Sequence, residues 1–151
     1  MKYSPHYLSR FLFFKIPIAW LAGVRPVEIS DKQTVLRLRY GRFNRNPFGS
    51  IYFAVLLMGG ELVTGIPLFK CIDERKANIS MLVVRNESVF LKKAKGTIRF
   101  VFDENEQIRQ ALEQLQKPGD QVRFTLHSRA VNEGGEIVAE FRFEWSLKKR
   151  S

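Results

Sequence analysis

A nearly uninterrupted apolar segment, residues 51–69, constrains the fold more than any other part of this 151-residue chain. Its length is close to that of a membrane-spanning helix. However, Glu61 lies in its middle, Pro67 lies near its end, and the sequences on both sides look like strands of a folded domain. The segment is also too long and too rich in glycine for a strand. We therefore predict a helix over residues 51–69 that is buried in the core.

Apolar and polar side chains alternate along much of the remaining chain. In residues 34–40, for example, Leu36 and Leu38 alternate with arginines. The same period of two runs through residues 97–102, 121–129 and 136–148. Strands of this kind have one dry face and one solvated face, which favours an antiparallel sheet. Because a helix that is apolar on all sides has to be covered on all sides, we predict a curved sheet wrapped around the central helix.

Turn and capping signals complete the predicted order of elements. The spacing of Asp103 and Glu106 is typical of a capping box, and the glycines at 134 and 135 indicate a hairpin turn. The predicted elements are a helix over 11–22, strands over 27–30 and 34–40, the central helix, a strand over 79–84 and 88–93 bent at 86–87, a strand over 97–102, a helix over 103–116, and strands over 121–129 and 136–148. The predicted fold class is α+β, with one domain over residues 1–151 that includes an N-terminal helical extension over 1–22.

The N-terminal segment has two interpretations. Residues 11–22 resemble the core of a signal peptide, but a lysine and a proline interrupt them and no small-residue cleavage site follows. We therefore predict an amphipathic helix with Phe11, Phe14 and Ile18 on one side. We expect it to cover the domain, with contact to a membrane surface as the alternative. Because a sheet alone leaves part of the central helix open, we also expect a second subunit and hence a dimer.

Composition argues against several kinds of site. The single cysteine, Cys71, cannot form an intramolecular disulfide, and no Cys/His cluster offers a metal site. With His6 and His127 as the two histidines, a histidine-based relay is poorly supported. We therefore expect a cytoplasmic protein with no metal and no transmembrane segment.

The net charge of +10, from 25 Lys and Arg against 15 Asp and Glu, implies attraction to anions. Nucleic acid, a membrane surface and a phosphorylated small molecule are all candidates, and a well-solvated basic surface explains the charge equally well. The basic residues are scattered, and no run of five like charges indicates a nucleic-acid arm. We therefore expect no stable complex with nucleic acid.

Glu61 is the residue that physical reasoning alone singles out for chemistry. An ionised carboxylate inside an apolar helix is unfavourable unless it is paired or hydrogen-bonded, and burial raises its pKa. Groups of this kind are enriched at functional sites. The alternative is a glutamate at the edge of the helix that reaches solvent or pairs with an arginine.

The stretch from Asn46 through Gly49 to Tyr52, followed by Glu61, resembles a motif of the hotdog-fold acyl-CoA thioesterases of the phenylacetic-acid-degradation type. That family shows an Asn, a loop Gly, a His-Gly-Gly that opens the central helix, and an acidic residue nine positions after the His. Here Asn46 and Tyr52 are six positions apart, and Tyr52 and Glu61 are nine positions apart. Residues 90–96 are similar to the aromatic-Leu-x-Pro-Ala-x-Gly stretch of the next strand. The resemblance covers about four-fifths of the chain and implies the hotdog fold.

The resemblance also implies a role for each matching residue. Glu61 would be the general base or nucleophile on a thioester, and Asn46 would position water or the carbonyl. The backbone N–H groups of Tyr52 and Phe53 would polarise that carbonyl. The other substrate-binding candidates are Gly49, Thr64 or Ser80 as a hydroxyl partner, and Arg85, Lys92, Lys93 and Lys95 for the phosphates of coenzyme A. The alternatives are a structural serine at position 80, edge-strand lysines that deter aggregation and a core aromatic at position 52.

The chain departs from the family at the start of the central helix, where Tyr52, Phe53 and Ala54 replace His-Gly-Gly. Phe53 is bulky where close approach of a substrate usually needs glycine. The leading prediction is an acyl-CoA thioesterase that is a homodimer or a dimer of dimers, with no cofactor beyond the coenzyme A of its substrate. The second prediction is a protein that binds acyl-CoA or a lipid-like ligand without turnover. Nucleic-acid binding, on charge alone, is the third.

Overall fold

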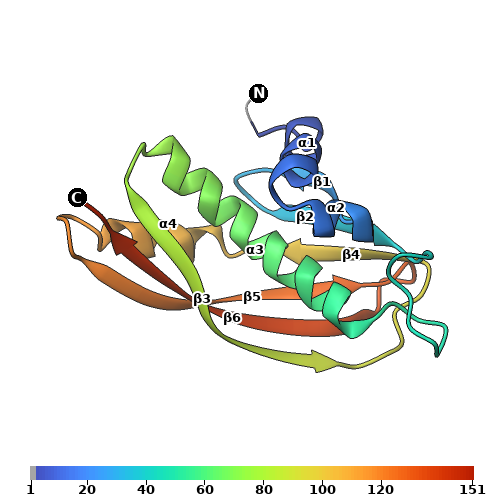
Figure 1. Cartoon of the computed structure of the whole chain (residues 1–151). Coiled ribbons are helices and arrows are strands. Elements are labelled where there is room, and N and C mark those ends of the chain that lie inside the picture. Colours follow the sequence, from blue (N-terminus) through green and yellow to red (C-terminus); the bar gives the residue numbers. More distant parts are fainter. Residues whose placement is uncertain (1–2) are drawn as a thin grey trace.

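The computed structural model describes residues 3–151 of the chain. Its helices and strands, in chain order, are α1 (Pro5–Lys15), α2 (Pro17–Ala22), β1 (Arg25–Ile29), β2 (Thr34–Arg39), α3 (Phe53–Glu74), β3 (Ile79–Phe90), β4 (Thr97–Phe102), α4 (Asn105–Glu113), β5 (Gln121–Val131) and β6 (Ile137–Lys149). The long central helix α3 lies across one face of the sheet that the strands form (Figure 1).

The six strands form one sheet in the order β1-β2-β4-β5-β6-β3, and every neighbouring pair is antiparallel. The sheet curves around α3, which confirms the predicted α+β hotdog fold. β3 is a single strand at one edge of the sheet, with a bulge between Val83 and Arg85. The bend predicted at residues 86–87 therefore lies slightly earlier in the chain.

α3 approaches the sheet closely at two adjacent glycines. A Cβ atom at Gly59 would lie 2.3 Å from the ring of Phe100 on β4, and one at Gly60 would lie 2.6 Å from the ring of Phe141 on β6. On β5, the strand between them, the Ser128 hydroxyl donates to the Gly60 carbonyl over 2.8 Å. These contacts hold the middle of α3 against three neighbouring strands.

By length and composition, α3 is the one helix within residues 3–151 that is suited to crossing a membrane. However, 67% of its most apolar stretch of 18 residues is buried inside the molecule. The structure thus confirms the predicted core helix. The observed helix begins at Phe53 and ends at Glu74, so it extends beyond the predicted boundary at residue 69.

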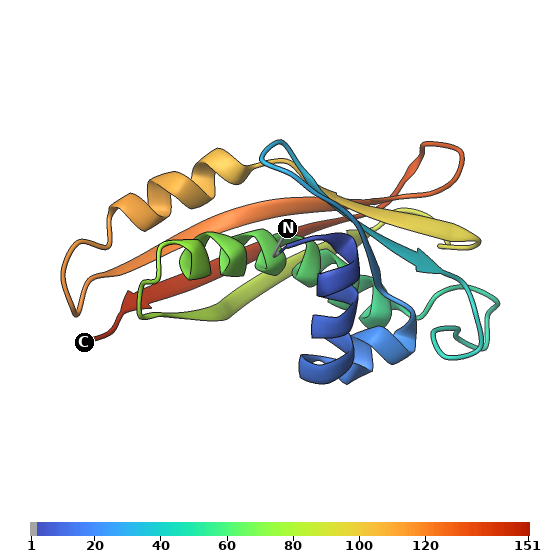
Figure 2. The same ribbon diagram turned by 90° about the horizontal axis from the view of Figure 1, so that it is seen from above.

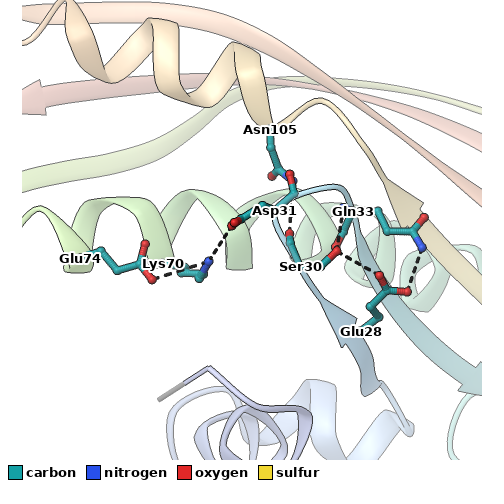
Figure 3. A network of polar contacts seen from close by, with 7 residues as sticks. All are labelled: Glu28, Ser30, Asp31, Gln33, Lys70, Glu74 and Asn105. Atoms are coloured by element: carbon teal, nitrogen blue, oxygen red, sulfur yellow. Dashed lines mark hydrogen bonds and ion pairs between the residues drawn. The ribbon is translucent and has the colours of Figure 1, made fainter. Parts of the chain in front are cut away.

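A polar network joins the β1–β2 turn to α3 and α4 (Figure 3). Glu28 accepts hydrogen bonds from the Ser30 hydroxyl and from the Gln33 side chain, over 3.0 and 2.8 Å. Lys70 of α3 lies 3.5 Å from the Asp31 carboxylate. At the start of α4, the Asn105 side chain donates to the Asp31 carbonyl over 3.1 Å. The turn between two strands therefore helps to position both helices.

The capping box predicted at the start of α4 is wrong. α4 begins after Glu104, and no side chain makes a capping hydrogen bond there. Asp103 instead pairs with Arg129 of β5 over 3.0 Å, and Glu106 pairs with Arg109 over 2.7 Å. The contacts of α4 with the β1–β2 turn replace the local cap that the spacing suggested.

The N-terminal extension forms two helices instead of the single helix predicted, and its first two residues lie outside the described residues. The residue before a proline disfavours the helical region, so the chain breaks ahead of Pro17, where α2 starts. The predicted apolar face is also wrong, because Phe14 and Ile18 are exposed whereas Leu8 and Leu12 are buried. Since α1 contacts β1 and α2 contacts α3, the extension covers part of the domain, as predicted.

We predict that Gly60→Ala destabilises the protein by roughly 1–3 kcal/mol, the range for an overpacked core. Alanine favours a helix over glycine by about 1 kcal/mol, so a loss of stability would identify the close contact with Phe141 as the larger effect. The free energy of urea-induced unfolding measures the change.

Gly134→Ala is the matched control for this substitution, because a Cβ there makes ordinary contacts in the exposed β5–β6 turn. It should change the free energy of unfolding by less than about 0.5 kcal/mol. A Gly60→Ala protein as stable as the parent would show that α3 can move away from the sheet without loss.

Candidate functional site

The Glu61 carboxylate lies on α3 in a largely buried position, and no hydrogen bond or ion pair within residues 3–151 reaches its oxygens. A Cβ atom at Gly65, one turn further along the helix, would lie 3.1 Å from Glu61 Oε1 and 3.3 Å from the Trp145 ring. The absence of a side chain at Gly65 thus makes room for the carboxylate beside an indole.

Burial raises the pKa of Glu61 to about 7, from an ordinary value of 4.5. Loss of water around the charged form is the cause, and no cation or hydrogen-bond donor among residues 3–151 compensates for it. A carboxyl group with this pKa exchanges its proton near neutral pH, which suits a general base. The structure therefore favours the buried-acid interpretation of Glu61 over a glutamate paired with an arginine.

An apolar cavity of about 200 Å³ opens beside this carboxylate. Its lining consists of Leu8, Phe11 and Ile16 from the N-terminal segment, Leu62, Gly65, Ile66 and Phe69 from α3, Met81 from β3, and Glu61 itself. Glu61 is the one charged residue among these. Because a cavity of about 150 Å³ with such a lining can hold benzene, this cavity has room for a small apolar group next to the carboxylate.

A larger cavity of about 750 Å³ lies at the N-terminal end of α3. Five of the predicted site residues line it, namely Asn46, Tyr52, Phe53, Lys92 and Lys93. Arg45 lines it as well, so this cavity has three cationic side chains at its wall. One of them, Lys92, forms an ion pair with Glu136, whereas Lys93 is exposed.

The backbone at the start of α3 provides donors for this cavity. The Tyr52 amide donates to the Asn44 carbonyl over 2.7 Å, so it is already used. Within the described chain, the amides of Phe53 and Ala54 have no acceptor. Together with the positive end of the helix dipole, these two groups can bind an anion or polarise a carbonyl.

Asn46 and Gly49 shape the loop that precedes α3. The Asn46 Oδ1 atom accepts from the amides of Phe48 and Ser50 over 2.9 and 3.3 Å, and its Nδ2 donates to the Ser50 hydroxyl over 3.0 Å. Gly49 has a φ of +74°, a conformation that favours glycine. The polar atoms of Asn46 are therefore engaged within the loop.

The Thr64 hydroxyl is buried in contacts within the protein. It donates to the Glu61 carbonyl over 2.8 Å and accepts from the Trp145 indole over 3.2 Å. It therefore links α3 to β6 instead of facing a cavity.

Two other predicted residues on β3 lie apart from both cavities. The Ser80 hydroxyl lies 3.2 Å from the Arg150 side chain, near the C-terminus. Arg85 lines a hollow together with Arg142 and Glu144 of β6. The residues that alternate with these two along β6, Phe143 and Trp145, are buried. Because side chains alternate along a strand, Arg85 lies on the face of the sheet that is remote from α3.

A further hollow of about 540 Å³ lies on the same outer face of the sheet. Its His127 pairs with Glu104 over 3.1 Å, and its Arg129 pairs with Asp103 over 3.0 Å. These groups are engaged with one another, and no group of three or more metal-ligating side chains occurs within residues 3–151. The hollow is therefore a weaker candidate site than the cavities along α3.

The N-terminal wall of the smaller cavity could not be predicted from the sequence. Leu8, Phe11 and Ile16 contact the surroundings of Glu61 although they are distant from it in the chain, and no local pattern signals such a contact. Arg45 is a further residue of the larger cavity that was not predicted, although its position next to Asn46 was an available signal.

The comparisons with known proteins concern nearly the whole chain. The family model described as "Domain of unknown function (DUF4442)" matches residues 5–147. A protein of unknown function from Pseudomonas aeruginosa, described as a probable thioesterase, has a similar structure, with a TM-score of 0.81 and 26% identity over 97% of both chains. A protein of unknown function from Chlorobaculum tepidum has a TM-score of 0.83 and 14% identity, over 97% of this chain and 98% of that chain. For a thioesterase from Haemophilus influenzae, the TM-score is 0.76 and the identity 10%, over 99% of this chain and 93% of that chain. No curated protein matches the chain.

We predict that Glu61→Gln stabilises the protein above pH 7 and leaves its stability unchanged below about pH 4.5. The pKa of Glu61 is about 7 in the folded protein and 4.5 as the ordinary value. As the pH rises between these values, the carboxyl ionises in the unfolded chain but not in the folded one, so the folded state loses stability. The full difference is about 3 kcal/mol above pH 7.

Urea unfolding of both proteins across this pH range measures the effect. Glu113→Gln, on the exposed side of α4, is the matched control and should show no such pH-dependent gain. A difference between Glu61→Gln and the parent that does not vary with pH would contradict desolvation of Glu61.

Proposed function

This chain belongs to the family described as domain of unknown function DUF4442, and we propose that it is a thioesterase-like hydrolase of acyl-CoA thioesters. The observation that carries the proposal is the Glu61 carboxyl group, which lies largely buried beside an apolar cavity, has no hydrogen-bond or ion-pair partner within residues 3–151, and has a pKa of about 7. The similarity to the Pseudomonas aeruginosa protein described as a probable thioesterase supports the class of reaction.

In the proposed reaction, the Glu61 carboxylate removes a proton from water as the water oxygen attacks the thioester carbonyl. The tetrahedral intermediate then breaks its carbon–sulfur bond, and the products are the free acid and the coenzyme A thiol, which takes up the proton. In the nucleophilic alternative, the carboxylate attacks the carbonyl itself and displaces the coenzyme A thiolate, and water then hydrolyses the resulting anhydride and supplies the proton of the thiol. The amides of Phe53 and Ala54 are the proposed donors to the carbonyl oxygen.

These amides and the Glu61 carboxylate are too far apart in one chain to act on one carbonyl. Phe53 and Glu61 are eight positions apart on α3, which corresponds to roughly 12 Å along the helix. We therefore propose that two copies of the chain form each site. Glu61 of one copy would lie beside the helix start of the other.

The β3 edge of the sheet is the proposed contact between the two copies. Its backbone has no neighbouring strand on one side within residues 3–151. Leu82, Val89 and Phe90 are exposed along it, with relative exposures of 64%, 48% and 43%. An apolar edge of this length is a template for pairing with another strand. Antiparallel pairing of two β3 strands about a two-fold axis would also make the two α3 helices antiparallel.

The two cavities match the two parts of an acyl-CoA ligand. The proposed phosphate ligands are Arg45, Lys92 and Lys93 at the larger cavity, since guanidinium and ammonium groups suit phosphate. The acyl group is proposed to occupy the apolar cavity beside Glu61, where burial of its surface provides the binding energy.

Binding of acyl-CoA without turnover is the second candidate function, and the position of Phe53 favours it. The Phe53 ring lies at the wall of the larger cavity and contacts the rings of Tyr52 and Phe90, with centroids 5.1 and 5.9 Å apart. A side chain of this size occupies the approach to the free amides, where glycine would leave space.

We expect the purified protein to hydrolyse at least one member of a panel of short, long and aromatic acyl-CoAs, measured as released thiol. Glu61→Gln should lower kcat by at least about 100-fold, the lower range for loss of a general base. The parent rate should rise as the pH passes through about 7, because the carboxylate is the active form.

Glu113→Gln is again the matched control and should retain the parent rate. Full activity of Glu61→Gln would exclude the proposed base. Thermal stabilisation by an acyl-CoA without hydrolysis would favour the second function.

We also expect a homodimer, with twice the chain mass of 17.6 kDa in light scattering. Leu82→Arg should convert it to a monomer, because it places a charge in the proposed apolar contact at the β3 edge. Ile18→Arg is the matched control, since Ile18 and Leu82 are 63% and 64% exposed. A parent protein that is monomeric, or a Leu82→Arg protein that stays dimeric, would contradict the proposed interface.

A further inference from the structure

The junction of α1 and α2 carries a group of exposed apolar side chains, which we call the elbow surface. It consists of Phe13, Phe14, Ile18 and Leu21, with relative exposures of 46%, 70%, 63% and 52%. Isolated exposed apolar residues are common, but several of them within one short segment point to an interaction site. In Figure 2 the two blue helices project from the body of the molecule.

The elbow surface is fixed in place by local structure. Pro17 separates the two helices. The Phe13 ring packs edge to face on Phe14 and on Trp20, with centroids 4.9 Å apart in both pairs. The core-facing positions of the same helices, such as Leu12 and Ala19, are fully buried. The side chains of the elbow surface are therefore not needed for the packing of the core.

The charged side chains of α1 and α2, the helices that carry the elbow surface, are all basic. Residues 3–27 contain Arg10, Lys15 and Arg25 but no aspartate or glutamate. Arg10 and Lys15 are exposed, whereas Arg25 donates to the Trp20 carbonyl over 2.6 Å and lies 4.4 Å from the Trp20 ring centre. The whole chain carries a net charge of +10. A partner for this surface has to be apolar inside and anionic at its boundary.

We propose that the elbow surface docks the protein on a lipid bilayer that contains anionic lipids. Phenylalanine, isoleucine and leucine side chains insert at the boundary between head groups and acyl chains, while lysine and arginine bind anionic head groups. Tryptophan side chains, such as that of Trp20, are enriched at the same depth of a bilayer. This inference does not depend on the proposed hydrolysis.

A second copy of the chain fits the elbow surface less well. A two-fold contact would place Arg10 and Lys15 of one copy opposite the same residues of the other copy. Such like-charge contacts oppose association, and the net charge of each chain adds to the repulsion. An anionic bilayer offers the opposite sign and an apolar interior together.

Co-sedimentation of the full chain with vesicles tests the proposal. Vesicles of phosphatidylcholine and phosphatidylglycerol in equal parts should bind the protein, whereas phosphatidylcholine alone should bind it much more weakly. The double substitution Phe14→Ser with Ile18→Ser should lower the partition coefficient by roughly tenfold or more, because it removes apolar surface from the contact. Lys15→Glu should lower it by roughly fivefold or more, and only for the anionic vesicles.

Phe48→Ser is the matched control, because Phe48 is 77% exposed on the loop before α3. It should bind the vesicles like the parent protein, and circular dichroism should show every variant folded. Equal binding of the elbow variant and the parent would overturn the proposal, as would no preference for anionic vesicles. Loss of a dimer or tetramer in light scattering of the elbow variant would also overturn it, since the surface would then be a contact between copies.

Discussion

The close approach of α3 to the sheet at Gly59 and Gly60 is the constraint on which the rest of the structure depends. With no Cβ atoms at these positions, the helix backbone reaches the rings of Phe100 and Phe141, and its rotation about its own axis is then fixed. Glu61 is the next residue of α3, so the same contact sets the direction of its side chain. The position of the candidate acid is thus a consequence of core packing and needs no hydrogen bond of its own.

No ion pair within residues 3–151 reaches this carboxyl group, although the chain is rich in cations. The chain has 25 Lys and Arg residues, yet the pKa of Glu61 is raised by loss of water. Three of the basic side chains, Arg45, Lys92 and Lys93, instead line the larger cavity, and Arg10 and Lys15 lie on α1. A nearby cation would hold the carboxylate ionised and lower its basicity. Separation of the acid from the cations therefore preserves a proton acceptor near neutral pH.

Local patterns in the sequence predict an element well where that element buries one face and exposes the other. The strand at residues 97–102 was predicted with both boundaries correct, because Ile98, Phe100 and Phe102 alternate with polar or half-buried neighbours. The buried acid was found because it is the one charge in an apolar segment. The wall that α1 contributes to its cavity could not be found, since it depends on packing between distant segments. The capping box failed for the same reason, because Asn105 binds a distant turn.

The two walls of the cavity beside Glu61 differ in how much change they tolerate. The wall formed by α3 belongs to a helix whose opposite side is locked against aromatic rings of the sheet. The wall formed by Leu8, Phe11 and Ile16 belongs to a short appended segment with no strand in it. Substitutions at Phe11 and Ile16, which are half-buried, can enlarge or narrow this cavity with little change to the scaffold, whereas Leu8 belongs to the core. Diversification of ligand size among relatives of this chain is therefore easiest through the amino-terminal segment.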